Sequence, residues 1–528
     1  MESSRRLFLQ IPFALAAIPA MAAKARRPRD ADLVEATIDD LARRIAARRL
    51  TAEALTRGYL ERITRLDSSG PTLRSVIEIN PEALDLARSL DRELGQRGPR
   101  GPLHGIPILL KDNIDTRDRM ATTAGSLALV GAKPAADAPL VRRLRDAGVV
   151  VLGKTNLSEW ANFRSSHSTS GWSSRGGLTR NPYALDRNPS GSSSGSAVAV
   201  AASLAAAAVG TETDGSIVSP SSVNGLVGIK PTVGLIRRRG IIPISQSQDT
   251  AGPMARTVRD AALLLQVMAD PDPDDPDSIA RVAGPVPDYT SGLDALGLRG
   301  ARLGVVRNSW GFDQDRVIGS ALEVLRSQGA VLVDPIEIPH RDEIGRAEDV
   351  ILHFEFKAGI ADYLSHLGST TPHRSLRDLI EFNERHRATV MPHFGQETFL
   401  AAEAKGPLTD PAYLKAREEA RRLSRTEGID AVMDRHQLDA LVAPTGGPAW
   451  LTDLIHGDRP TGSSSSFAAV SGYPSVTVPG GFFSGLPSGI SFFGRANSEA
   501  VLLRLAYAFE QVTRHRRPPR YAATAGEK

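Results

Sequence analysis

Short apolar runs and longer mixed stretches follow one another along this chain. The runs at residues 106–110 and 149–152 contain no polar side chain, which is typical of strands buried on both faces. Residues 81–97 place Pro in a first helical turn, and residues 37–48 begin with a Thr cap, so both stretches predict helices. Further strands are predicted at 75–79, 225–229, 303–306, 331–333, 438–442, 475–478 and 489–493, and further helices at 51–66, 137–147, 197–208, 257–269, 317–328 and 499–513.

This alternation of strand and helix predicts an α/β fold with a large, mostly buried sheet. The chain has 528 residues, 41% of them hydrophobic, which is enough for a large core and excludes a disordered chain. Its formal net charge of +4 is small for this length and its basic runs are short, so we expect no nucleic-acid partner. Cysteine is absent, which excludes disulfides, thiolate nucleophiles and cysteine metal sites.

The first 22 residues have the order of an export signal. Arg5 and Arg6 form a twin-arginine pair, an apolar run at 7–20 follows, and residues 20–22 fit a small-x-small cleavage site. The run is too short to span a bilayer, which takes about 20 apolar residues. The sequence therefore predicts a twin-arginine-type signal peptide at 1–22, a mature domain at 23–528, and a periplasmic or secreted protein without a membrane anchor after cleavage.

Two motif matches are set aside on their context. Residues 148–155 fit the phosphate-loop pattern, but the four residues between the two glycines are Val-Val-Val-Leu and predict the strand itself. Residues 191–195 fit G-x-S-x-G centred on Ser193, but a polar, proline-containing loop precedes them where a nucleophile elbow needs a buried strand. A Ser193 nucleophile with a downstream histidine stays as the mechanistic alternative. The 11 histidines show no metal-ligand spacing, and the role expected for His104 is a structural hydrogen bond.

Residues 270–277 form an acidic loop broken by prolines. Clustered carboxylates suit Ca²⁺, but the glycine and distal Glu of an EF-hand loop are missing. We expect a solvated linker here, and no metal site.

Three features carry candidate chemistry. Lys111 ends a buried apolar strand, where loss of solvation lowers the pKa of an amine. Residues 190–196 form a Ser- and Gly-rich loop, and residues 210–217 form a tight Gly-containing turn whose successive N–H groups are able to converge on one oxygen. Each feature alone is weak, since a buried Lys is often paired with a carboxylate and Gly-Ser loops are common.

In this order and spacing the three features resemble the amidase signature family, whose Gly-Ser-Ser loop and Gly-Thr-Asp-x-Gly-Gly-Ser motif correspond to 191–197 and 210–216. The stretches at 105–112, 225–232 and 249–256 also fit, and the resemblance spans about residues 33–520. Within the family, the stretches at 154–163 and 210–218 are most similar to bacterial peptide amidase. The resemblance implies one large domain with a central mixed sheet and helices on both faces.

The same resemblance implies a Ser-cisSer-Lys triad that needs no metal or organic cofactor. Ser216 is the expected nucleophile, Ser192 the proton relay with a cis peptide bond before it, and Lys111 the neutral base. The expected oxyanion donors are the backbone N–H groups of Thr213, Asp214, Gly215 and Ser216. Three positions depart from the family pattern: Glu212 stands for its usual Asp, Asp214 for a Gly, and Val218 for an Arg.

The sequence thus predicts a serine amidohydrolase that converts a carboxamide to carboxylate and ammonia. The resemblance to peptide amidase implies the C-terminal amides of peptides as substrates. Two alternatives stay open: a glutamine-hydrolysing subunit of a tRNA amidotransferase, and a non-catalytic binding protein on the same scaffold. The oligomeric state is not fixed by the sequence.

Overall fold

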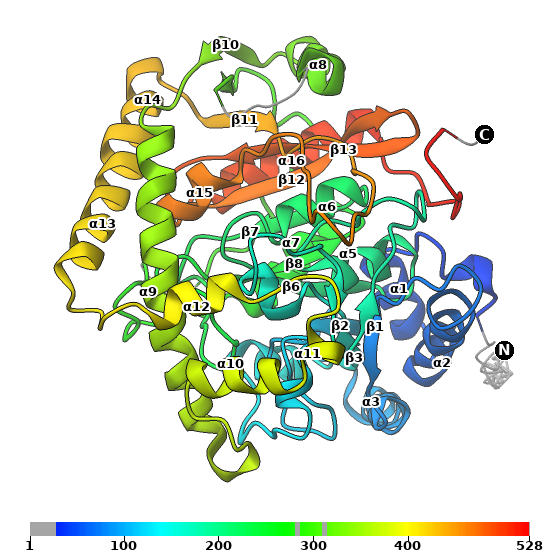
Figure 1. The fold of residues 1–528 in the computed structure, drawn as a ribbon. Helices are drawn as coiled ribbons and strands as arrows, with labels where there is room; N and C mark the ends of the chain where they lie inside the picture. The colour runs from blue at the N-terminus through cyan, green and yellow to red at the C-terminus, as the bar shows by residue number, and fades with distance from the viewer. Residues whose placement is uncertain (1–27, 280–285, 309–313, 527–528) are drawn as a thin grey trace, which may run out of the picture.

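The computed structural model describes residues 28–279, 286–308 and 314–526. One α/β domain is built on a mixed sheet of 11 strands in the order β1-β3-β2-β6-β8-β7-β12-β13-β11-β9-β10, with helices flanking it (Figure 1). The predicted fold class is therefore confirmed. The predicted signal peptide lies outside the described residues. No helix in the described ranges has the length and apolar character needed to cross a membrane.

Most strands lie where the apolar runs predicted them. The sheet strands are β1 (Val76–Ile79), β2 (Pro107–Lys111), β3 (Val150–Thr155), β6 (Ala207–Glu212), β7 (Val227–Lys230), β8 (Thr250–Ala255), β9 (Arg302–Val306), β10 (Val331–Ile336), β11 (Ala440–Pro444), β12 (Ser475–Phe483) and β13 (Leu486–Phe493). A separate two-stranded ribbon joins β4 (Trp172–Ser173) and β5 (Gly177–Leu178).

The helices that pack along the sheet also follow the predicted pattern, except for the short helix at 218–223, which was not predicted. They are α1 (Ile38–Ala46), α2 (Ala52–Arg62), α3 (Ala83–Arg97), α4 (Pro139–Asp146), α5 (Ser194–Ala201), α6 (Val218–Val223), α7 (Val258–Met268), α8 (Gln314–Ser327) and α16 (Glu499–Thr513). Thr37 caps α1 by accepting a hydrogen bond from the Asp40 N–H, as the Thr signal predicted.

One predicted helix is wrong in its second half. The stretch 197–208 was expected to be helical throughout, but α5 ends at Ala201 and residues 207–212 form strand β6. Ser203, with a φ of 54°, turns the chain between the two elements. This alanine-rich, almost wholly apolar stretch carries neither a helical nor a strand period, so the local pattern does not mark this boundary.

Strand β6 matters because it brings two predicted site segments together. It pairs in parallel with β2, with Leu110 opposite Val209, and antiparallel with β8. Parallel neighbours end at the same edge of a sheet, so Lys111 at the end of β2 and the loop after β6 lie side by side.

A group of helices between β10 and β11 was not predicted. It comprises α9 (Arg341–Leu367), α10 (Leu376–Arg385), α11 (Arg387–Val390), α12 (Glu397–Glu403), α13 (Pro411–Arg421) and α14 (Asp430–His436), and it is followed later in the chain by α15 (Ser465–Ser471). Figure 1 shows the group gathered to one side of the sheet. The buried residues of the long helix α9 face several different neighbours along its length. Its sequence therefore has no single apolar stripe at helical spacing.

Arginines pair with most of the carboxylates of the acidic loop at 270–277, so the expectation of a solvated linker holds only for its exposed residues 273, 274 and 276. Arg238 pairs with Asp275, and Arg237 lies 3.0 Å from Asp270. Asp277 is buried and pairs with Arg417 and Arg421 of α13. Opposite charges brought together by the fold replace water as the partners of these carboxylates.

Candidate active site

Lys111 is fully buried at the end of β2, and its amine contacts three oxygens. Nζ lies 2.7 Å from Ser192 Oγ, 2.9 Å from Thr211 Oγ1 and 3.1 Å from the Thr211 carbonyl oxygen. No carboxylate contacts the amine among the described residues. Burial lowers the pKa of Lys111 to about 7, although the charges of Asp249 and Glu212 act in the opposite direction.

This surrounding suits an uncharged amine. A neutral lysine has two N–H donors and one lone pair, and the two oxygens of Thr211 take up the donors. The lone pair is then free to accept the Ser192 O–H. The geometry therefore makes Lys111 able to draw a proton from Ser192.

Ser192 lies in a tightly packed loop before α5, and the Gly191–Ser192 peptide bond is cis, as expected. The Ser192 carbonyl accepts a hydrogen bond of 3.1 Å from the Ser158 N–H. A Cβ on Gly191 would stand 2.2 Å from Ser158 Oγ, so only glycine fits at this position.

Ser216 follows β6 and lies next to the Ser192 loop. The Ser193 N–H donates to the Ser216 carbonyl oxygen at 3.1 Å, which fixes the two loops against each other. Ser216 is 8% exposed, whereas Ser192 is fully buried. The hydrogen bonds of the described residues include the one between Lys111 and Ser192 but none between the hydroxyls of Ser192 and Ser216.

The four expected oxyanion donors are free. None of the backbone N–H groups of residues 213–216 has a hydrogen-bond acceptor within the described part of the chain. Gly215 has a φ of 76°, and a Cβ there would lie 2.9 Å from Ser465 Oγ. Glycine thus permits both the left-handed backbone and the close approach of α15.

Two buried carboxylates brace this loop. Glu212 Oε2 accepts hydrogen bonds from the N–H groups of Ile217 and Val218 at 2.7 and 2.9 Å. Asp249 Oδ1 accepts one from Thr213 Oγ1 at 2.5 Å, while its Oδ2 accepts two from the backbone of Ile244 and Ser245. Burial raises the pKa of Asp249 to about 6. Sequence reasoning did not single out Asp249, whose only signal was its place in the motif at 249–256.

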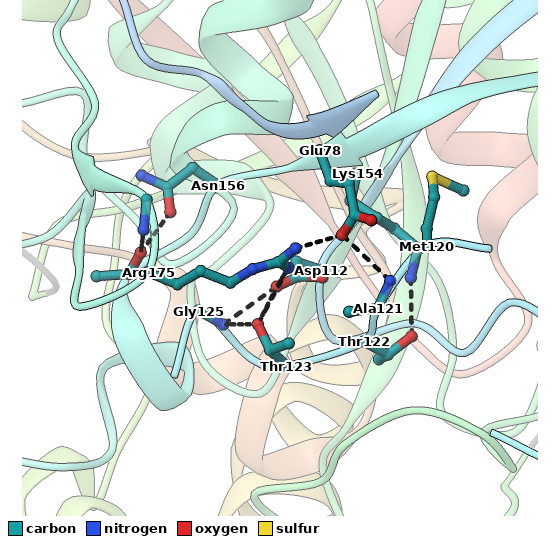
Figure 2. Close-up of polar contacts among 12 residues, drawn as sticks. Glu78, Asp112, Met120, Ala121, Thr122, Thr123, Gly125, Lys154, Asn156 and Arg175 are labelled. Atoms are coloured by element: carbon teal, nitrogen blue, oxygen red, sulfur yellow. Dashed lines mark hydrogen bonds and ion pairs between the residues drawn. The ribbon is translucent and has the colours of Figure 1, made fainter. Parts of the chain in front are cut away.

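A charged network holds the strand end that carries Lys111 (Figure 2). The Arg175 guanidinium pairs with Glu78 of β1 and lies 3.1 Å from Asp112 Oδ2. Asp112 directly follows Lys111, and its carbonyl oxygen accepts hydrogen bonds from the N–H groups of Thr123 and Ala124. These contacts fix the backbone on which Lys111 is mounted, and no sequence signal pointed to Arg175.

The structure also shows the surroundings of the other residues and motifs that the sequence singled out. The Ser193 hydroxyl is buried and bonds to the backbone oxygen and N–H of Thr211, so it braces β6. His104 Nε2 lies 3.0 Å from the Leu90 carbonyl oxygen, the structural role that was expected. Of the residues between the glycines at 148 and 153, those at 150–152 belong to strand β3. This agrees with the expectation that the stretch is a strand and not a phosphate-binding loop. The described residues contain no group of three or more His, Cys, Asp or Glu side chains placed to hold a metal ion.

Comparison with known proteins agrees with this geometry. The Amidase family model matches residues 54–503. The chain belongs to the amidase family. It is therefore an enzyme that hydrolyses amide bonds.

Individual relatives match over nearly the whole chain. The peptide amidase PAM, solved in complex with the competitive inhibitor chymostatin, is 55% identical with a TM-score of 0.89, covering 92% of this chain and 99% of that one. A probable amidase from Arabidopsis thaliana is 43% identical over 93% of this chain and 92% of its own length. A glutamyl-tRNA(Gln) amidotransferase subunit of Halorhodospira halophila is 36% identical over 90% of this chain and 97% of its own length.

Proposed function

We propose that this amidase hydrolyses the C-terminal amides of peptides with a Ser216–Ser192–Lys111 triad. The observation that carries the proposal is the contact of a buried, low-pKa lysine amine with the Ser192 hydroxyl. The substrate class is supported by the 55% identity to a peptide amidase.

In the proposed reaction the Lys111 amine accepts the Ser192 proton while Ser192 accepts the Ser216 proton. Ser216 Oγ then bonds to the amide carbon, and the N–H groups of residues 213–216 stabilise the resulting oxyanion. The relay returns a proton to the leaving nitrogen, the C–N bond breaks, and ammonia departs. Water attacks the acyl-enzyme by the same relay and releases the carboxylate and free Ser216.

The decisive experiment measures ammonia released from a peptide amide by wild type and by Ser216→Ala. We expect the variant to lose about 10³-fold or more in kcat. Ser219→Ala is the matched control, because this hydroxyl pairs with Ser190, 2.8 Å away, and not with the triad. Equal activity of wild type and Ser216→Ala would refute the proposed nucleophile.

A second assay separates the substrate classes. The similarity to amidotransferase subunits makes glutamine the alternative amide donor. A panel of peptide amides, glutamine, fatty amides and aryl amides is compared by kcat/KM. Higher kcat/KM for peptide amides supports the proposal, whereas a preference for glutamine favours the amidotransferase role. Failure to hydrolyse any amide, with no labelling of Ser216 by a fluorophosphonate, favours a non-catalytic binding protein.

We also propose that the mature domain at about 23–528 acts outside the cytoplasm. The support is the order of Arg5, Arg6, the apolar run and the cleavage site. Cell fractionation of wild type and of the Arg5→Lys/Arg6→Lys double variant tests this. Export of wild type with cytoplasmic retention of the double variant is expected, and wild type found in the cytoplasm contradicts the proposal.

A further inference from the structure

Asp214 places a carboxylate beside the proposed oxyanion donors, two residues before Ser216. Its Oδ2 accepts a hydrogen bond of 2.6 Å from Ser466 Oγ on α15. Its Oδ1 is buried and has no hydrogen-bond partner among the described residues. This oxygen is thus available to a further donor, although the Ser465 hydroxyl already helps to stabilise the charged form of Asp214.

Glu348 of α9 belongs to the same cluster and is 8% exposed. Its Oε1 accepts a hydrogen bond of 2.8 Å from Gln248 Nε2, which also lies 3.4 Å from the Thr213 carbonyl oxygen. Gln248 therefore joins α9 to the oxyanion loop. Burial and the charge of Asp214 both raise the pKa of Glu348 well above its usual value, so the two carboxyls affect each other.

Gln248 supplies an independent sign that a ligand is missing. The side chain is only 1% exposed, and its Oε1 has no hydrogen-bond partner within the described ranges. An orphaned acceptor of this kind inside a protein calls for a donor. The unmet groups of this cluster, Asp214 Oδ1 and Gln248 Oε1, are both acceptors, so a single partner for both must donate more than one hydrogen bond, as an ammonium or guanidinium group does.

The charge of the cluster points the same way. A carboxylate next to the oxyanion site opposes the negative charge that forms on the substrate oxygen. The pKa of Lys111 is lowered to about 7, so near pH 7 its amine offsets this negative charge only in part. Burial raises the pKa values of both Asp214 and Glu348, and a cation supplied by the substrate would favour their charged forms while donating to the free acceptors.

We propose that Asp214, Glu348 and Gln248 form a subsite for an ammonium or guanidinium group carried by the acyl part of the substrate. The inference rests on the proposed function, since it names the kind of amide that the Ser216 site prefers. Glycine, the family's usual residue at position 214, has no side chain to take this role.

The test compares kcat/KM for isosteric amide pairs at about pH 7, where α-ammonium and guanidinium groups are largely charged. One pair is N-acetyl-argininamide and N-acetyl-citrullinamide, and the other is alaninamide and lactamide. We expect wild type to favour the cationic member of at least one pair by about tenfold or more, the usual effect of a hydrogen-bonded charge.

Glu348→Gln and Asp214→Asn are both expected to bring that ratio close to one. A ratio between two substrates cancels any general loss of catalysis that a variant suffers. Glu343→Gln is the matched control, because this carboxylate is exposed in the first turn of α9 and pairs only loosely with Arg346, at 3.8 Å. It should leave the ratio unchanged.

The outcomes separate this inference from the proposed function. Hydrolysis of both members of each pair at equal kcat/KM by wild type overturns the cation subsite and leaves the amidase reaction intact. A wild-type preference that both variants retain also overturns it. No release of ammonia from any of the four amides counts against the proposed function itself.

Discussion

Thr211 contacts the amine of Lys111 twice, through its hydroxyl at 2.9 Å and its carbonyl oxygen at 3.1 Å. Both Thr211 oxygens accept hydrogen bonds from N–H groups of the amine, so the lone pair of a neutral amine points toward Ser192. In the proposed mechanism, protonation of this amine removes the base, so we expect the reaction to be sensitive to pH.

We expect kcat/KM to rise with pH through about 7 and to level off above it, because the pKa of Lys111 is lowered to about 7. The Asp249 charge favours the ammonium form of Lys111, so Asp249→Asn should move the midpoint to lower pH. Asp260→Asn is the control, because this carboxylate is also buried but accepts a hydrogen bond from the Ile38 N–H instead. Identical midpoints in the measured pH–rate profiles of wild type and Asp249→Asn would contradict the proposal that Lys111 is the base.

Glu212 predicts a graded loss of activity. Its carboxylate accepts hydrogen bonds from the two N–H groups that directly follow Ser216. Weaker hydrogen bonds at this point should displace Ser216, the proposed nucleophile. Glu212→Gln keeps a neutral acceptor and should lower kcat about tenfold, since charge-assisted bonds are roughly twice as strong. Glu212→Ala leaves two buried donors unpaired and should lower kcat further. Steady-state kinetics check the order, and a change confined to KM would argue against a positioning role.

A pair of glycines separates backbone strain from chemistry. Gly215→Ala forces a side chain into a left-handed backbone and toward Ser465, so we expect kcat to fall about 10²-fold as the oxyanion donors shift. Gly98→Ala also places a side chain at a positive φ, 79°, but its Cβ meets nothing within 4 Å. It should reduce stability by about 1–3 kcal/mol and leave kcat unchanged. Equal kcat values in the two variants would contradict the assigned oxyanion loop.

Arg175 predicts a large effect on folding. Replacing it with Met leaves the buried carboxylate of Asp112 and the part-buried carboxylate of Glu78 without their cation, and breaking a buried pair typically costs about 3–5 kcal/mol. Arg387→Met removes an exposed pair with Glu384 and should cost less than about 1 kcal/mol. Urea unfolding of both variants measures the difference, and equal losses would show that the network contributes little.

The sequence predicted the strands of the sheet and the burial of Lys111 better than the side chains that surround Lys111. Lys111 was recognisable because it ends a continuous apolar run, and burial of that run is a local property. Asp249 and Arg175 act through partners 36 and 63 residues away along the chain, Thr213 and Asp112, and no local pattern encodes such pairings. The end of α5 at Ala201 was not predicted, because alanine is compatible with both a helix and a buried strand.

The order of the segments along the gene separates two tasks. Lys111, Ser192 and the oxyanion loop all lie before residue 217, whereas α9 and α15, which approach that loop from outside, lie between 341 and 471. A crossover between homologues placed between residues 257 and 340 would exchange α9 and α15 as a unit. The proposed triad, the oxyanion loop, Gln248 and Asp249 would be inherited together from the other parent.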